Sequence, residues 1–287
     1  MATTLYVSDL DGTLLGADAK ISEASAAMLN EAIAEGALFS IATARTPSTV
    51  ANLLRDVDTR LPFIVMTGSA MWNPATQSYA DVINIPTATA LQVMERFRKN
   101  QLPTFIYTLS GGVINIYHYG KLSETEQKFI AERDDSAYKV FHIPADGTSL
   151  LPDPLDDVVL FYAMQPNIHT EHTYKEITDI EGCNPIYYHD IYGPDMGILE
   201  VFSSAASKAN ALRRLRRMTG ADRVVVFGDN INDLPMMREA DVAVAVENAV
   251  AEVKEAADIV IGPNTSDSVA RYILESVRAE KHDDTSL

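Results

Sequence analysis

The stretch Thr4-Leu5-Tyr6-Val7-Ser8-Asp9-Leu10-Asp11-Gly12-Thr13 joins a short apolar run to an acidic turn, and it decides the fold class. Residues 4–8 predict a β-strand that stops at Asp9. The two carboxylates of Asp9 and Asp11, followed by a glycine, can both face one crevice while the chain turns sharply. In an open parallel sheet, ligands bind at the carboxyl ends of the strands. We therefore expect a buried strand that delivers Asp9 and Asp11 to a binding site.

Apolar runs alternate with helical patterns on both sides of the middle of the chain. Ser22 is expected to cap a helix that ends at Gly36, and a later helix is expected over residues 250–257. Strands that are apolar on both faces and separated by helices indicate a parallel sheet covered on both sides, which right-handed crossovers make doubly wound. The fold class is therefore α/β, with a Rossmann-like core. The further predicted strands are residues 37–41, 63–66, 224–227, 242–245 and 259–261.

Residues 84–194 differ from the flanks because they contain more aromatic residues, prolines and polar turns. This composition, with short alternating runs, favours antiparallel strands. The expected pairs are 104–108 with 113–117 through Gly111-Gly112, and 158–164 with 185–188, around a helix over 170–178.

We interpret residues 84–194 as an inserted α+β cap domain. Residues 1–83 and 195–287 then close into one discontinuous core domain. The hinges are expected at Ile83–Thr87 and Pro194–Leu199.

The composition excludes several classes of partner. The chain has 287 residues with 23 basic and 40 acidic side chains, a net charge of −17, which repels nucleic acid and anionic lipid. The basic run Arg213–Arg217 is interpreted as the solvated face of a surface helix. No apolar stretch reaches 18 residues, so no membrane partner is expected. A single cysteine, Cys183, and an N-terminus without signal-peptide features indicate a reduced, cytoplasmic setting. The oligomeric state stays open.

Three more polar signals fall where predicted strands end or helices begin. Carboxylates that converge there would repel one another, and a hard divalent cation with oxygen ligands, Mg²⁺, removes that cost. A metal, a lysine and a threonine hydroxyl beside free backbone N–H groups form a cradle for a dianion such as phosphate. The three signals are Thr43-Ala44-Arg45, Lys208 and Gly228-Asp229-Asn230-Ile231-Asn232-Asp233.

These segments resemble the four motifs of the haloacid dehalogenase superfamily of phosphotransferases. The pattern of DxDGT, a strand-ending Ser or Thr, a distant Lys and GDxxND is matched by Asp9–Thr13, Thr43, Lys208 and Gly228–Asp233. An insert between the second and third motifs is similar to the Cof-type subfamily with its large α/β cap. The resemblance implies a phosphoric monoester hydrolase that uses Mg²⁺ and acts on a small phosphorylated metabolite, such as a sugar phosphate.

The resemblance also implies a role for each matched residue. Asp9 is the nucleophile that becomes an aspartyl phosphate, and Asp11 is the general acid and base. The phosphoryl oxygens would be held by Thr43, Lys208, Asn232 and the amide of Leu10. The metal ligands would be Asp9, the backbone carbonyl of Asp11, Asp229 and Asp233, the last directly or through water.

Two assignments outside the motifs stay open. Arg45 is either a substrate contact or a surface ion-pair partner. The inserted domain would close over the site and touch the leaving group, with candidate contacts Asp190, Tyr192 and Asp195.

Structural interpretations compete with each functional one. Thr43 could merely cap a helix. A cation such as Lys208 at a helix start opposes the helix dipole, which favours a functional role for it. Two other functions are considered: a phosphosugar mutase similar to phosphomannomutases, and a non-catalytic scaffold. The scaffold is disfavoured because every charged motif residue is present.

Overall fold

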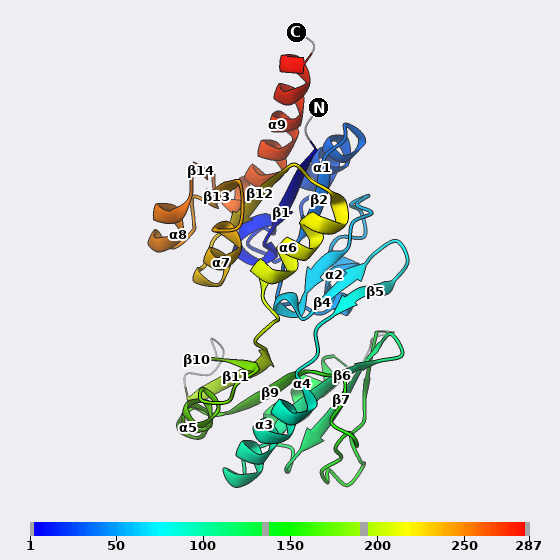
Figure 1. The fold of residues 1–287 in the computed structure, drawn as a ribbon, viewed down its shortest axis with the longest axis vertical. Coiled ribbons are helices and arrows are strands. Elements are labelled where there is room, and N and C mark those ends of the chain that lie inside the picture. Colours follow the sequence, from blue (N-terminus) through cyan, green and yellow to red (C-terminus); the bar gives the residue numbers. More distant parts are fainter. Residues whose placement is uncertain (1–2, 134–137, 190–194, 285–287) are drawn as a thin grey trace. The chain divides into compact units, whose positions relative to one another are not determined.

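The computed structural model describes residues 3–133, 138–189 and 195–284, and the chain divides into two compact units. The first unit combines residues 1–81 with 207–287, and the second is residues 82–206. Figure 1 draws both units with their elements labelled. Because each unit has its own sheets and core, each is described by itself.

The first unit is built on a five-stranded parallel sheet, in which Ser8 pairs with Phe227 on one side and with Ile41 on the other. From β1 (Thr4–Ser8), the strand that contains Ser8, the chain first moves to the edge strand β2 (Leu38–Ile41) and later returns to β12 (Arg223–Gly228) on the other side. The topological switch point therefore lies beside that strand, and its carboxyl end is where a ligand is expected. The order across the sheet is β14 (Ile259–Ile261), β13 (Val242–Val246), β12 (Arg223–Gly228), β1 (Thr4–Ser8) and β2 (Leu38–Ile41).

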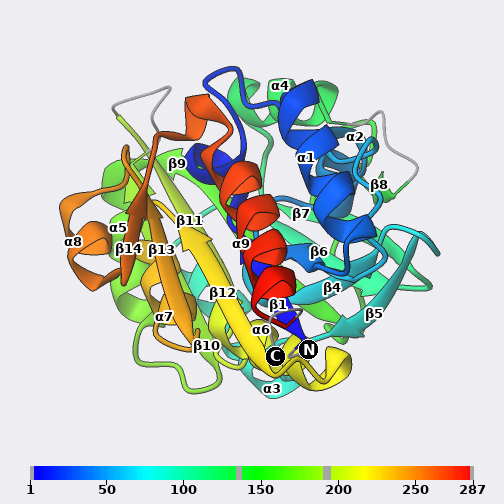
Figure 2. The ribbon, with the colours of Figure 1, turned by 90° about the horizontal axis from the view of Figure 1, so that it is seen from above.

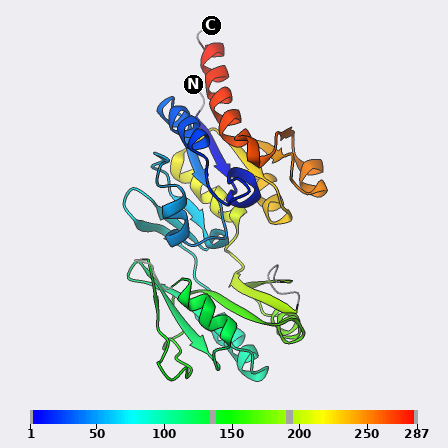
Figure 3. The ribbon, with the colours of Figure 1, turned by 180° about the vertical axis from the view of Figure 1, so that it is seen from behind.

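Helices cover both faces of this parallel sheet, which confirms the doubly wound α/β class. Figures 1 and 3 show α1 (Glu23–Ala34) and α9 (Ser268–Asp284) on one face, with α6 (Lys208–Thr219) and α7 (Leu234–Met237) on the other. Figure 2 shows α1 and α9 side by side. The remaining helices of this unit are α2 (Pro47–Leu53) and α8 (Ala251–Ala256).

The predicted ends of α1 are confirmed. The Ser22 hydroxyl accepts a hydrogen bond from the backbone N–H of Ser25, and Gly36 follows the helix with a φ of 111°. That positive φ is a conformation which glycine adopts without strain, so the sequence carried both signals.

The strand predicted over residues 63–66 exists, but it does not extend the parallel sheet as expected. β3 (Phe63–Val65) pairs antiparallel with β4 (Ala70–Asn73) in a three-stranded sheet completed by β5 (Ser78–Val82). One parallel bridge, between Ala42 and Ile64, connects β3 to the end of β2. A short buried run carries no information about its partner, which is why the sequence misplaced it.

The second unit contains a six-stranded sheet with α3 (Thr87–Lys99) and α5 (Asn167–Ile177) on one face. On the other face lies α4 (Glu124–Ala131), whose Phe129 packs against Phe105 and Tyr162 of the sheet. A core cluster joins Phe97 of α3 and Ile177 of α5 to Phe161 and Leu199 of the sheet. The elements of this unit are, in sheet order, β10 (Cys183–His189), β11 (Met196–Ser203), β9 (Val158–Pro166), β6 (Thr104–Ser110), β7 (Val113–Tyr119) and β8 (Lys139–Phe141), with α3 (Thr87–Lys99), α4 (Glu124–Ala131) and α5 (Asn167–Ile177).

Two expectations about this unit need correction. The hairpin of β6 and β7 is present, but β9 and β10 do not pair with each other, because β11 lies between them. The residues of β11 are expected from the sequence to belong to the return hinge, Pro194–Leu199, and to the core domain that begins at residue 195. In the structure its backbone is paired on both sides within the second sheet, and the division falls at 206/207.

Among the described helices, none combines the length and apolar composition that crossing a bilayer requires.

Candidate active site

The position of Asp9 follows from the pairing of β1. Its backbone N–H continues the ladder by donating to the carbonyl of Phe227 at 3.0 Å, and its side chain is buried. The chain then turns through Gly12, which has a φ of 78°. A Cβ atom at Gly12 would lie 2.4 Å from Oδ2 of Asp229, so only glycine lets the acidic turn approach the next motif this closely.

Asp229 and Asp233 are brought in by the carboxyl end of β12. The Thr13 hydroxyl donates to Oδ1 of Asp229 at 2.8 Å. Oδ2 of Asp233 accepts the backbone N–H groups of Asp229 at 3.1 Å and Asn230 at 3.2 Å. Asp233 is fully buried, and a Cβ at Gly228 would lie 2.7 Å from its Cβ. The loop therefore wraps around one carboxylate and directs it inward.

Lys208 enters from the first turn of α6, which the hydroxyl of Ser207 caps by accepting from the backbone N–H of Asn210. Its ammonium group is buried and donates to Oδ1 of Asp9 at 2.5 Å and to Oδ1 of Asp233 at 2.8 Å. The lysine thus joins the first and fourth motifs, which are more than 200 residues apart in the sequence.

Burial dominates the electrostatics of this group. Desolvation raises the pKa of Asp9 to about 7, against the lowering effect of the Lys208 charge. Burial also raises the pKa of Asp229. For Lys208, burial alone would lower the pKa, but the charges of Asp9 and Asp233 outweigh it and raise the pKa. The carboxylates of Asp9, Asp229 and Asp233 therefore favour a further positive charge, because the single charge of Lys208 does not balance them.

The three carboxylates fit a divalent cation. Asp9, Asp229 and Asp233 each offer an oxygen, and these atoms lie within 4.8 Å of one another. One ammonium group opposes three carboxylates here, so a net negative charge is left in a buried setting. Oxygen-only donors are the set that Mg²⁺ prefers. The arrangement could therefore hold a metal ion.

The remaining predicted residues lie around this cluster in different states. Thr43 is buried, and its hydroxyl accepts the backbone N–H of Arg45 at 3.2 Å, so it does serve a turn. Leu10 is buried and Asn232 is exposed. Arg45 pairs with Asp11, through Nε to Oδ2 at 2.8 Å and Nη2 to Oδ1 at 2.5 Å. The carboxylate of Asp11 thus faces the turn after β2.

The sequence reasoning missed two asparagines that hold the first motif. Asn248 donates to the carbonyl of Gly12 at 2.7 Å, and the side chain of Asn264 donates to the carbonyl of Leu15 at 2.7 Å. The backbone N–H of Asn264 also bonds to Oδ1 of Asn248 at 2.9 Å. Single asparagines in loops carry no distinctive spacing, so nothing in the sequence alone pointed to them.

Of the three candidate contacts in the inserted segment, Asp195 lies among the described residues. Asp190 and Tyr192 lie outside the described residues. The carbonyl of Asp195 accepts the backbone N–H of Asn167 at the start of α5. Burial raises the pKa of the Cys183 thiol to about 11, which makes it unreactive as a nucleophile.

The basic run on α6 makes structural ion pairs, as expected for a surface helix. Arg213 pairs with Glu239, while Arg216 pairs with Asp241. Arg214 pairs with Asp81 and donates to the carbonyl of Gly68. These partners neutralise charges that a phosphate site would need to keep free.

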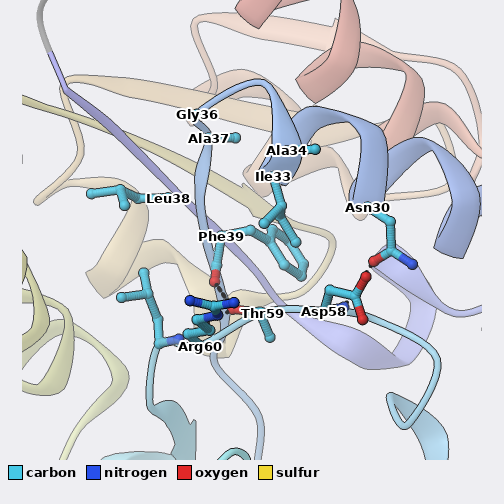
Figure 4. A pocket seen from close by; sticks show the side chains of 11 residues that line it. Asn30, Ile33, Ala34, Gly36, Ala37, Leu38, Phe39, Asp58, Thr59 and Arg60 are labelled. Carbon is cyan, nitrogen blue, oxygen red and sulfur yellow. Dashed lines mark hydrogen bonds between the residues drawn. The ribbon is translucent and has the colours of Figure 1, made fainter.

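Figure 4 shows a separate pocket at the amino end of β2, the end opposite to Thr43. Its polar side chains hold the local backbone: Asn30 donates to the carbonyl of Asp56 and accepts from the N–H of Asp58. The hydroxyl of Thr59 donates to the carbonyl of Phe39. The side chains of Asn30 and Thr59 are thus occupied by the chain's own backbone.

Comparison with known proteins decides the family. A family model described as haloacid dehalogenase-like hydrolase matches residues 6–273, nearly the whole chain. This chain belongs to the haloacid dehalogenase-like hydrolases. The resemblance carried by the four motifs, including its Cof-type layout, is thereby confirmed.

Relatives of this family member cover almost its full length. The pyridoxal phosphate phosphatase YbhA of Escherichia coli (strain K12) is 25% identical over 287 residues, covering 95% of this chain and 98% of that protein. The 5-amino-6-(5-phospho-D-ribitylamino)uracil phosphatase YitU of Bacillus subtilis (strain 168) is 24% identical over 280 residues, covering 94% and 96%. These names are consistent with the predicted enzyme class, a phosphoric monoester hydrolase.

The solved structure of TM0651 from Thermotoga maritima has the same fold. It aligns with a TM-score of 0.72 and 25% sequence identity, and covers 96% of this chain and 97% of that one. The α/β fold class inferred from the sequence is confirmed by this likeness.

Proposed function

We propose that this chain is a Mg²⁺-dependent phosphatase that hydrolyses small phosphomonoesters, sugar phosphates or similar metabolites, through an aspartyl phosphate on Asp9. The observation that carries the proposal is the buried carboxylate of Asp9, held 2.5 Å from Lys208 Nζ beside Asp229 and Asp233. A carboxylate fixed in this way can act as a nucleophile because its orientation is set before substrate arrives.

In the first half-reaction, an oxygen of Asp9 attacks phosphorus while the ester P–O bond breaks. Asp11 gives its proton to the departing alkoxide. An ammonium has three N–H bonds, and those of Lys208 toward Asp9 and Asp233 leave one for a phosphoryl oxygen. Thr43, Asn232 and the amide of Leu10 would hold the other phosphoryl oxygens.

In the second half-reaction, water attacks the phosphorus of the aspartyl phosphate. Asp11, now a carboxylate, takes a proton from this water as the bond between Asp9 and phosphorus breaks. Inorganic phosphate leaves and both aspartates return to their starting states. Lys208 keeps Asp9 in place throughout, since it is bonded to Asp233 as well.

The proposed metal ligands are Asp9, Asp229, Asp233 and the backbone carbonyl of Asp11. When bound, Mg²⁺ supplies positive charge that offsets the carboxylates and the phosphate dianion. We assign residues 82–206 the role of the cap that selects the substrate, and the cytoplasmic setting stays a prediction.

The decisive experiment is phosphate release from a panel of phosphate esters, including p-nitrophenyl phosphate, with and without Mg²⁺. Asp9→Asn should lower kcat by at least about 10⁴-fold, because the nucleophile is lost. Asp58→Asn, an exposed aspartate in the same unit, should change it less than about twofold. Substantial activity in Asp9→Asn, or none in the natural enzyme across the panel, would refute the proposal.

The same assay separates a phosphatase from a mutase. A phosphatase releases free phosphate in proportion to substrate consumed, whereas a mutase yields an isomeric phosphate ester. We expect free phosphate, and stoichiometric isomer formation without phosphate release would establish the mutase instead.

A further inference from the structure

The guanidinium group of Arg45 grips the carboxylate of Asp11 at two points. Nε donates to Oδ2 at 2.8 Å and Nη2 donates to Oδ1 at 2.5 Å, a two-point geometry that fixes both the plane and the direction of a carboxylate. The Asp11 side chain is 52% exposed and that of Arg45 is 26% exposed. Exposed ion pairs contribute little to stability, so folding alone gives little reason for this one.

The backbone of Arg45 is itself fixed. Its N–H donates to the hydroxyl of Thr43, and its carbonyl accepts the N–H of Met66 at 3.0 Å. The guanidinium therefore projects from an anchored turn after β2 toward the acidic turn after β1. Asp11, by contrast, sits in a turn whose next residue, Gly12, has a φ of 78°.

Asp11 is separate from the cluster that Lys208 organises. The oxygens that converge belong to Asp9, Asp229 and Asp233, while both oxygens of Asp11 are engaged by Arg45. A general acid that no other group orients would sample several rotamers, and a displacement of about 1 Å can cost about 100-fold in rate. Of the hydrogen bonds found among the described residues, those from Arg45 are the ones that direct this carboxylate.

We propose that Arg45 is a positioning residue, which acts on the reaction through Asp11 by fixing the plane and direction of its carboxyl group. This inference rests on the proposed function. The proton moves from Asp11 to the alkoxide as the P–O bond breaks, and a second proton moves from water to Asp11 as the aspartyl phosphate is hydrolysed. Arg45 itself exchanges no proton in either step. The sequence left two roles open for Arg45, a substrate contact or a surface ion-pair partner. Under this proposal Arg45 is an ion-pair partner, and the residue it pairs with is the general acid Asp11.

The test is a double-mutant cycle measured with two leaving groups. The value of kcat/KM reports the first half-reaction, in which an alkyl ester needs protonation and p-nitrophenyl phosphate does not. Arg45→Met should lower kcat/KM by about 10–100-fold for the alkyl phosphate that the natural enzyme hydrolyses fastest. For p-nitrophenyl phosphate the same change should cost less than about threefold. Arg45→Lys, which keeps the charge but not the two-point grip, should fall between the natural enzyme and Arg45→Met.

The cycle itself uses Asp11→Asn as background. With Asp11 disabled, adding Arg45→Met should lower kcat/KM for the alkyl ester less than about threefold, because the two residues act as one unit. The matched control is Arg55→Met, whose guanidinium pairs with exposed Asp56. It should leave every value within about twofold of its parent.

Each outcome has one meaning. A loss from Arg45→Met that persists in the Asp11→Asn background would show direct substrate contact and overturn the proposal. An equal loss with both leaving groups would show a general structural role and also overturn it. If the natural enzyme hydrolyses nothing, the proposed function fails, and this inference fails with it. If Asp9→Asn is inactive but the effects of Arg45→Met and Asp11→Asn on kcat/KM are additive, the proposed function stands and the proposed role of Arg45 is refuted.

Discussion

Buried carboxylates occur in both units, and their surroundings differ. In the second unit, Glu126 is fully buried and its oxygens accept from Gln165 at 2.8 Å, from the N–H of Ser123 at 2.8 Å and from the Ser123 hydroxyl at 2.9 Å. Nε2 of His118 lies 3.2 Å from Oε1. In the first unit, Asp9 and Asp233 share one lysine, and Asp229 beside them accepts from the Thr13 hydroxyl. A buried carboxylate in the second unit is thus fully hydrogen-bonded by its own chain, whereas those in the first unit lack enough positive charge to balance them.

This difference separates a structural charge from a functional one. Glu126 completes the capping box of α4 with Ser123, and Gln165 of β9 in the same unit donates to its other oxygen. The acids of the first unit come from two distant segments and keep a net negative charge that local donors do not remove. Under the proposed function, a bound cation and a phosphate dianion would complete this cluster.

The largest effect is expected from Lys208→Met. It removes the one cation bonded to both Asp9 and Asp233, so kcat/KM should fall by about 10³-fold, and the free energy of unfolding without Mg²⁺ should fall by about 3 kcal/mol. Enzyme assays and urea unfolding measure the two effects. Arg213→Met on the same helix, which breaks an exposed pair with Glu239, should cost less than about 1 kcal/mol and little activity. Equal effects in both variants would contradict the contrast.

Mg²⁺ should stabilise the chain by binding to the cluster of Asp9, Asp229 and Asp233. At a concentration 100 times its Kd, it should raise the free energy of unfolding by about 2.7 kcal/mol. Burial raises the pKa of Asp9 to about 7 and also raises that of Asp229, so protons compete with the metal below pH 7. The Kd should therefore be several-fold weaker at pH 6 than at pH 8.

Urea midpoints with and without Mg²⁺ check this effect in two variants. Asp229→Asn should lose most of the stabilisation, whereas Glu126→Gln should keep it, because the metal does not depend on the second unit's carboxylate. If the increase in urea midpoint caused by Mg²⁺ does not depend on pH, or is still present in Asp229→Asn, then Mg²⁺ binds at another place.

Glu126→Gln should destabilise the chain by about 2 kcal/mol, since an amide nitrogen would then face the donors of Ser123 or Gln165. The kcat/KM of the folded enzyme should stay within about twofold of the natural value. Glu124→Gln, exposed on the same helix, should cost about 0.5 kcal/mol or less. A large activity loss in Glu126→Gln at full folding would place this carboxylate in the machinery after all.

The smallest effect concerns Glu200 of β11, whose pKa burial raises to about 7. A carboxyl group with a raised folded pKa costs stability as pH rises from its ordinary value, near 4.5, to about 7, and the cost is constant above that. Glu200→Gln removes the cost, so it should raise the free energy of unfolding by about 1 kcal/mol at pH 8 and by almost nothing at pH 4.5. Unfolding curves of Glu200→Gln and the natural protein at the two pH values test this prediction. A lower free energy of unfolding for the variant at pH 8 would contradict it.

Local signals in the sequence were enough to predict the class of the fold and the residues of the charged cluster. Asp9, Asp229 and the turns around Gly12 follow apolar runs, and parallel strands bring their carboxyl ends to one edge. Signals of this kind are local, since they depend on side-chain periodicity and on the backbone freedom of one or two residues. Lys208 was singled out as the lysine of the third motif, and its unfavourable place at a helix start, which favoured a functional role, is explained in the structure by the acids it meets.

Only the tertiary structure decided which partners these elements meet. It placed β11 between β9 and β10, put β3 in a small antiparallel sheet, and gave Arg45 to Asp11. It also brought Asn248 against the carbonyl of Gly12, 236 residues away. Such pairings depend on register and on the closure of long loops, where many alternatives have similar local energies. A local pattern therefore predicts that a residue is buried or turned, but the assembled chain chooses what it touches.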